Sequence, residues 1–182
     1  PPANAEQVFD ELFVADRLLE GDNQGACERV ETVVANGAIG SSWLKYLSLC
    51  RVFTGELDAA RLAADLVREL SPEDEAFFSL ATFLSDGGDT RLVDLRSPTA
   101  LHLAMVRVAR LNLPENIAAE VQPSLLKSIA VAPNASTSLR LQAAEKAEAL
   151  GLLETEMLVE LYASIFFSDE EVDKVFQAGA TA

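Results

Sequence analysis

The sequence predicts an all-α fold of about ten helices arranged as antiparallel hairpins. Ala, Leu and Glu are abundant, and β-branched or aromatic residues form no alternating runs that would indicate strands. Helix caps and breakers also divide the chain at short intervals. Apolar residues make up 49% of the 182 residues, enough for one packed core, whereas no stretch approaches the roughly 18 unbroken apolar residues of a membrane span. We therefore expect a single compact domain with no membrane insertion.

Glycine, serine and proline mark the helices of the first half. The stretch from Ala5 to Leu19 carries apolar side chains at helical spacing, namely Val8, Leu12, Ala15 and Leu19. Further helices are predicted over about 24–35, 41–54 and 57–70, since glycine follows or serine precedes them. Ser71-Pro72 and Ser97-Pro98 each predict an N-cap with proline at the first helical position.

Shorter helices are predicted beyond residue 111. Pro114 and Pro123 each begin one, the second over 124–130, and longer helices follow over 137–150 and 154–166. A capping box predicts a last helix over 169–177. The segment 91–95 could be extended, but a single strand would have nothing to pair with.

A repeat is the most informative feature of the first half. The segment 19–26 recurs as 53–60, with Gly21 to Gly55 and Ala26 to Ala60 both 34 residues apart. This is the length of a tetratricopeptide (TPR) unit, and Gly55 to Ala60, followed by Leu70-Ser71-Pro72, resembles the centre of that motif. A third step falls near 88–89, where the pattern decays. Residues 1–96 are therefore predicted to form a TPR-like α-α superhelix rather than an unrelated α-bundle, and residues 97–182 to form further hairpins or a capping bundle.

The two cysteines are placed symmetrically about a turn. Cys27 and Cys50 are equally distant from the midpoint of the turn over 36–41, so in an antiparallel hairpin they lie at the same height. We expect them to form a disulfide, and hence an oxidising compartment. The alternative is two small buried thiols in a cytosolic core.

Several segments together resemble a known group of proteins. They are Cys27 with the run 43–50, and the runs 77–81, 98–105, 132–135 and 139–147. They look like a group of uncharacterised, signal-peptide-bearing α-proteobacterial proteins with TPR-like helices. The resemblance implies a periplasmic or otherwise extracytoplasmic mature chain and supports the disulfide, and it brings no catalytic residue. The first residue is Pro rather than Met, so we expect that a preceding segment was removed.

Charge argues against nucleic acid as a partner. The net charge is −15, and Lys and Arg form no cluster that could bind phosphates. Residues 1–96 hold 18 acids and 8 bases, 97–153 hold 4 and 5, and 154–182 hold 7 and 1. The near-neutral middle is either a buried layer between solvated helices or an apolar groove that receives a partner.

The sequence contains little that could do chemistry. His102, the single histidine, lies between two leucines and is more typical of a core residue than of a ligand or a base. One histidine and two cysteines cannot complete a zinc site, and nucleophile-elbow and phosphate-loop motifs are missing. The acids at 86–89 lack the spacing of a calcium loop. We expect no catalysis, no metal and no cofactor.

These observations favour a non-catalytic interaction scaffold or adaptor that presents a concave helical surface to a protein or peptide. An acidic groove would favour a basic partner. The predicted contact residues on the inner helices are Trp43, Tyr46, Arg51, Phe77 and Phe78. Trp43 and Tyr46 are also plausible core residues, and they would contact a partner only if they are exposed on a concave face. The alternative is a helical accessory domain of an envelope or peptidoglycan-processing enzyme, and a hydrolase using paired carboxylates is a more distant one.

Overall fold

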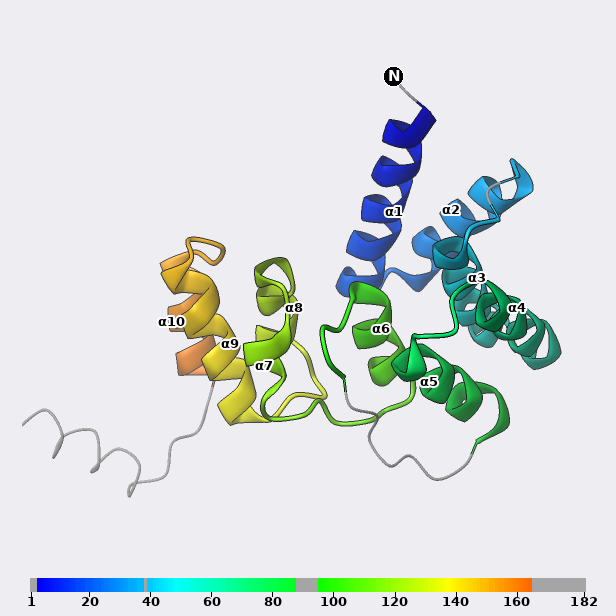
Figure 1. Ribbon diagram of the computed structural model, residues 1–182. Helices are drawn as coiled ribbons and strands as arrows, with labels where there is room; N and C mark the ends of the chain where they lie inside the picture. Colours follow the sequence, from blue (N-terminus) through cyan, green and yellow to red (C-terminus); the bar gives the residue numbers. More distant parts are fainter. Residues whose placement is uncertain (1–2, 38, 88–94, 165–182) are drawn as a thin grey trace, which may run out of the picture.

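The computed structural model describes residues 3–37, 39–87 and 95–164, and within these ranges every regular element is helical (Figure 1). The all-α prediction is therefore confirmed. In chain order the elements are α1 Ala3–Glu20, α2 Asn23–Ala35, α3 Ser41–Thr54, α4 Leu57–Leu70, α5 Glu75–Asp86, α6 Ala100–Val108, α7 Ile117–Glu120, a 3₁₀ turn η1 Pro123–Leu125, α8 Leu126–Ala130, α9 Thr137–Ala149 and α10 Thr155–Ala163.

The two Ser-Pro pairs do not form the predicted N-caps, and this part of the prediction was wrong. Ser71 instead ends α4, because its backbone N–H bonds to the Val67 carbonyl. The residue before a proline is disfavoured in helical conformation, which accounts for the end of α4 before Pro72. Asp74 caps α5 and Thr99 caps α6, each accepting the backbone N–H three residues on.

The short helices of the second half begin close to their predicted positions. Pro123 opens the turn η1 that leads into α8, whereas α7 starts three residues after Pro114. Helix α10 lies within the predicted range 154–166. The helix predicted over 169–177 lies outside the described residues, as do residues 91–94 of the segment considered for a strand.

The 34-residue repeat is present in the backbone. Gly21 and Gly55 both adopt the left-handed conformation, with φ of 86° and 78°. The residue after each glycine donates its N–H to a carbonyl five residues back, Asp22 to Arg17 and Glu56 to Arg51, both at 2.9 Å. These are matching Schellman turns. A TPR-like superhelix over the whole of residues 1–96 stays a prediction.

Helix α6 forms the centre of the molecule. It packs on α5 and on α1, as Figure 1 shows, and every residue from Ala100 to Val106 is buried. Packing against two helices explains why most residues of this helix are apolar. A buried layer therefore accounts for this part of the near-neutral middle of the sequence.

The C-terminal helices pack mainly on one another. Helix α9 contacts α7, α8 and α10, and three buried alanines, Ala143, Ala144 and Ala147, let these helices approach closely. Asn134 joins this part to the rest, because its side chain donates to the Leu111 carbonyl at 2.8 Å and its carbonyl accepts from Leu113 N–H. Among the described residues no helix is long and apolar enough to cross a membrane.

Candidate partner-binding surface

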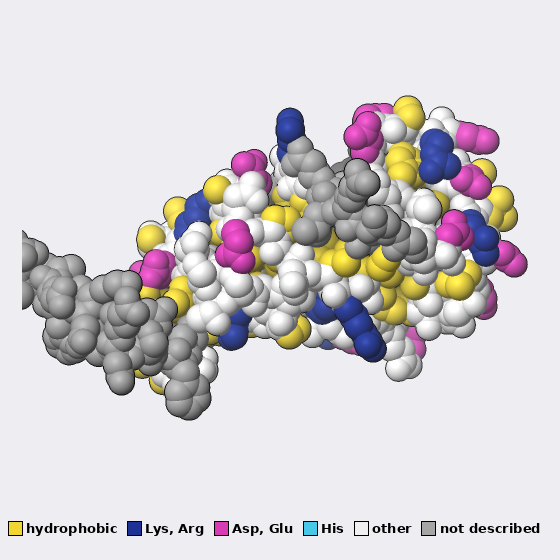
Figure 2. Space-filling view, turned by 90° about the horizontal axis from the view of Figure 1, so that it is seen from below, with side chains coloured by type: hydrophobic (Ala, Val, Ile, Leu, Met, Phe, Trp, Pro, Cys, Tyr) yellow, Lys and Arg dark blue, Asp and Glu magenta, His cyan; other side chains and the backbone are white. Residues whose placement is uncertain are grey.

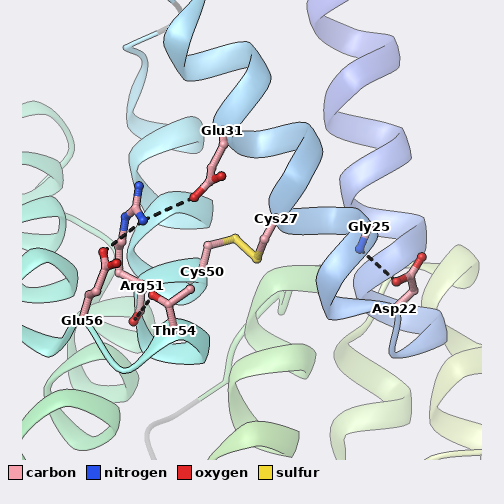
Figure 3. The surroundings of a disulfide bond; sticks show 8 residues. All are labelled: Asp22, Gly25, Cys27, Glu31, Cys50, Arg51, Thr54 and Glu56. Carbon is pink, nitrogen blue, oxygen red and sulfur yellow. Dashed lines mark hydrogen bonds and ion pairs between the residues drawn. A yellow bond between two sulfur atoms is a disulfide. The ribbon is translucent and has the colours of Figure 1, made fainter.

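The disulfide predicted from symmetry is present. Cys27 of α2 and Cys50 of α3 are bonded, with their Cα atoms 5.5 Å apart (Figure 3). On the chain-entropy account, a closed loop of this length stabilises the fold by about 3 kcal/mol. Arg51, beside the disulfide, forms ion pairs with Glu31 of α2 at 3.3 Å and with Glu56 at 3.0 Å. The first two hairpins are therefore joined both covalently and by charge.

The predicted contact residues do not form one exposed surface. Trp43 and Phe77 lie in the core, with 3% and 0% of their surface exposed, and so offer a partner nothing to contact. Burial, helped by the charge of Glu11, raises the pKa of Tyr46 to about 12. Large aromatic side chains are as typical of a core as of an interface, and here packing takes them.

Arg51 and Phe78 are only partly buried, but both already have partners. Arg51 makes the ion pairs described above, and Phe78 packs edge-on against Phe77 and beneath the Arg68 guanidinium, 4.6 Å from its ring centre. Tyr46 is likewise only partly buried, so three of the five predicted contact residues keep some exposed surface.

His102 belongs to a polar cluster that joins three helices. Its Nε2 lies 3.2 Å from Asp74 Oδ1, and Lys45 of α3 donates to the other carboxylate oxygen at 2.6 Å. Burial acts to raise the pKa of Asp74, but hydrogen bonds from His102, Lys45 and the Phe77 N–H outweigh it and hold that pKa well below its usual range.

This cluster superficially resembles a hydroxyl–histidine–aspartate triad because Thr99 Oγ1 lies 3.0 Å from His102 Nδ1. The backbone N–H of Thr99, however, donates to the same nitrogen at 3.1 Å. The Nδ1 lone pair is therefore already used by a helix cap, and Nε2 carries the proton toward Asp74. The side chain of His102 is 8% exposed, which agrees with the core role expected from the sequence.

The first helix exposes several large apolar side chains. Residues 5–9 of α1 are all exposed, and the exposed fractions of Val8, Phe9 and Leu12 are 56%, 65% and 65%. The apolar face predicted from Val8 to Leu19 is covered only toward its C-terminal end. Val14 and Leu18 are the fully buried residues instead. In Figure 1 the N-terminal half of α1 projects away from the other helices.

A groove of about 530 Å³ runs beside this exposed surface, between α1 and the end of α2. Arg29 of α2 spans it and donates to Asp10 of α1, with its Nε 2.9 Å from the carboxylate. The rest of the lining is mixed in character and consists of Ala5, Glu6, Phe9, Thr32, Val33 and Asn36. We call Val8, Phe9, Leu12 and this groove the α1 surface.

The repeat relates the α1 surface to a buried position. Phe9 and Trp43 are 34 residues apart, and both are aromatic. Trp43 is buried in a helix that packs against α2, α4 and α5, whereas α1 packs mainly on α2 and α6. The α1 surface is thus the repeat position that neighbouring helices cover in the second hairpin. The 34-residue period relates Phe9 to Trp43 in the sequence, but only the burial of each side chain in the structure shows which of the two is exposed.

A second exposed stripe lies on α4. Leu62, Leu66 and Leu70 recur at one-turn spacing and are exposed, but none of them lines a described groove. Figure 2 shows acidic side chains gathered mainly toward the end of the molecule that holds these N-terminal hairpins. Among the described residues, no three His, Cys, Asp or Glu side chains are grouped as a metal would require.

Comparison of this chain with protein families, with curated proteins and with solved structures finds no match.

Proposed function

We propose that this protein is a non-catalytic interaction module, and that its α1 surface binds an amphipathic helix of a partner protein. The observation that carries the proposal is the pair Phe9 and Trp43, equivalent in the repeat but 65% and 3% exposed. Stacked helical hairpins bury such positions against the next hairpin. A partner helix laid on α1 would cover Phe9 in the same manner.

The charge of the α1 surface favours a basic partner. Helix α1 carries five acids, Glu6, Asp10, Glu11, Asp16 and Glu20, against the single base Arg17. Asp10 is neutralised by Arg29, but Glu6 lines the groove with no ion-pair partner among the described residues. Lysines flanking an apolar stripe would complement this surface and speed association.

A non-catalytic role is supported by how the single histidine is used. Both ring nitrogens of His102 are engaged, one by the Thr99 N–H and the other by Asp74. A general base needs a free lone pair directed at its substrate. The only side chain that ordinarily exchanges protons near neutral pH therefore serves to hold α5 and α6 together.

An oxidising, extracytoplasmic location in a bacterial envelope is part of the proposal. Its support is the disulfide between Cys27 and Cys50, since such bonds persist outside the reducing cytosol. Mass spectrometry of the native protein, alkylated without reductant, tests this part. Unmodified cysteines are expected, and alkylated Cys27 and Cys50 would contradict it.

Binding can be tested with a synthetic helix of roughly 14 residues, about four turns, with leucines on one face and lysines on the other. A matched peptide with glutamates in place of the lysines controls for charge. Isothermal titration is expected to show binding of the lysine peptide and at least tenfold weaker binding of the glutamate peptide.

Leu12→Asp separates apolar docking from bulk charge. The substitution adds a negative charge that would attract the lysine peptide, so weaker binding would show that the apolar contact at this position outweighs charge attraction. Leu62→Asp on α4 is the matched control, because Leu62 is 62% exposed and Leu12 is 65% exposed. We expect at least a tenfold loss for Leu12→Asp and little change for Leu62→Asp. Equal or tighter binding by Leu12→Asp would refute the α1 surface, and a loss confined to Leu62→Asp would transfer the site to α4.

A further inference from the structure

A separate cavity of about 280 Å³ lies where the N-terminal hairpins meet the C-terminal helices, and we call it the junction cavity. Its walls come from the end of α1, from α6, and from α8 with the turn that follows it. None of its lining residues belongs to the α1 surface. The cavity therefore offers a second site, independent of the proposed partner-binding function.

The interior of this cavity is apolar. Four of its lining residues are apolar and themselves buried, namely Leu103, Ala104, Leu113 and Ile129. Val131 also lines it and is 57% exposed, so it lies toward the solvent side. Apolar walls of this kind hold the hydrocarbon part of a small ligand.

Arg107 supplies a positive charge in the same cavity. Its guanidinium donates to the carbonyls of Leu18 and Leu19, the last turn of α1, and burial lowers its pKa. No carboxylate of the described residues forms an ion pair with it. Glu20 is also at the cavity, but it pairs with Arg17 at 3.5 Å.

The carbonyl contacts do not exhaust what Arg107 can bind. A guanidinium has five N–H donors in a fixed plane, and two N–H···O contacts are made here. The remaining donors suit a carboxylate, which a guanidinium recognises better than a lysine ammonium does. The surrounding segment 97–153 is also the part of this acidic chain in which bases balance acids, with 5 against 4.

We propose that the junction cavity binds a small amphiphilic monocarboxylate, with its carboxylate on Arg107 and its alkyl chain among Leu103, Leu113 and Ile129. A volume of about 280 Å³ holds roughly nine non-hydrogen atoms, taking the share of a water molecule, about 30 Å³, for each. Octanoate has this size and this chemistry. Ser128 and Asn134 also line the cavity and add polar groups to its wall.

The test is titration with octanoate, followed by heteronuclear NMR, and with 1-octanol as a neutral ligand of the same chain length. Octanoate is expected to shift the signals of Leu103 and Ile129, and to bind at least tenfold more tightly than 1-octanol. Equal affinity for the two ligands would overturn the role of Arg107, and the absence of any shift with octanoate would overturn the site.

Two variants check the location of the ligand. Ser128→Leu fills the cavity from α8 without altering Arg107, and we expect it to weaken octanoate binding at least tenfold. Arg107→Met removes the charge at similar length and is expected to weaken octanoate but leave 1-octanol unchanged. Ser138→Leu on the exposed side of α9 is the matched control and should bind as the wild type does. Unchanged octanoate binding by Ser128→Leu would place the ligand elsewhere, whether or not Arg107→Met folds.

Discussion

The hairpins α1–α2 and α3–α4 share a backbone turn but differ in what covers them. Both turns have a left-handed glycine and the same pair of backbone hydrogen bonds, and the equivalent Ala26 and Ala60 are both buried. The contact between the two helices of each hairpin differs one turn further from the glycine. In the first hairpin Asp10 and Arg29 form an ion pair, whereas the residues 34 positions later, Leu44 and Ala63, are apolar and buried.

This difference shows which hairpin is interior. An ion pair spanning a groove costs little at a solvent-facing edge, but it would pay a large desolvation penalty between packed hairpins. Leucine and alanine at the same places are stable only when neighbouring helices cover them. The first hairpin is therefore the open end of the stack among the described helices, and the second is its interior. The α1 surface follows from this arrangement.

The largest effect is expected from truncating the two equivalent aromatic residues. Trp43→Ala removes a buried side chain and should lower the free energy of unfolding by about 3–5 kcal/mol. Phe9→Ala removes an exposed one and should change stability by less than about 0.5 kcal/mol. Urea denaturation monitored by circular dichroism measures both. Equal losses would mean that Phe9 is covered in solution and that the two hairpins do not differ as described.

Removing the bond between the two hairpins should have the next largest effect. The double variant Cys27→Ala, Cys50→Ala is expected to lose about 3 kcal/mol of stability, because the unfolded chain regains the entropy that the closed loop removes. Differential scanning calorimetry of the variant, beside the wild type with and without reductant, measures the loss. A variant as stable as the oxidised wild type would show that charge and packing alone join α2 to α3.

The Asp74 cluster should make the interior of the stack sensitive to acid. Asp74 has a pKa held below its usual range, so it contributes stability above its unfolded pKa of about 4 and loses that contribution as pH falls below it. Asp74→Asn keeps a capping side chain but loses the charge, and should cost about 2 kcal/mol at neutral pH. Thermal melts across pH should show the wild type and the variant converging on acidification. A constant difference down to pH 2 would contradict the cause assigned to the shift.

The smallest effect tests what the hairpins have in common. Gly21→Ala and Gly55→Ala each force a side chain into the left-handed conformation and should each cost about 1 kcal/mol. A Cβ at Gly21 would come within 3.9 Å of Arg107, an ordinary contact, so no further clash separates the two. Equilibrium unfolding in urea compares them. A difference above about 1 kcal/mol would mean that the two turns are not equivalent.

Local rules predicted most of the helices but not the two Ser-Pro caps. Helix α4 begins and ends at the predicted residues because capping and glycine conformation act within a few residues. Asp74 and Thr99 were missed as caps because several residues nearby could cap. The choice depended on side-chain contacts: Lys45 of α3 bonds to Asp74, whereas His102 of the capped helix itself bonds to Thr99. The junction cavity was also invisible, since it joins α1 to a turn more than 100 residues later.

The sequence by itself determined the helical class, the matching turns at Gly21 and Gly55, and the pairing of Cys27 with Cys50. Each depends on periodicity or spacing along the chain, which the residue order contains directly. The tertiary structure alone decided that Trp43 and Phe77 are core residues, while Phe9 and Leu12 are exposed. Exposure depends on which helices pack against a face. The sequence does not show this, because apolar residues occur both in the core and on the surface of folded proteins.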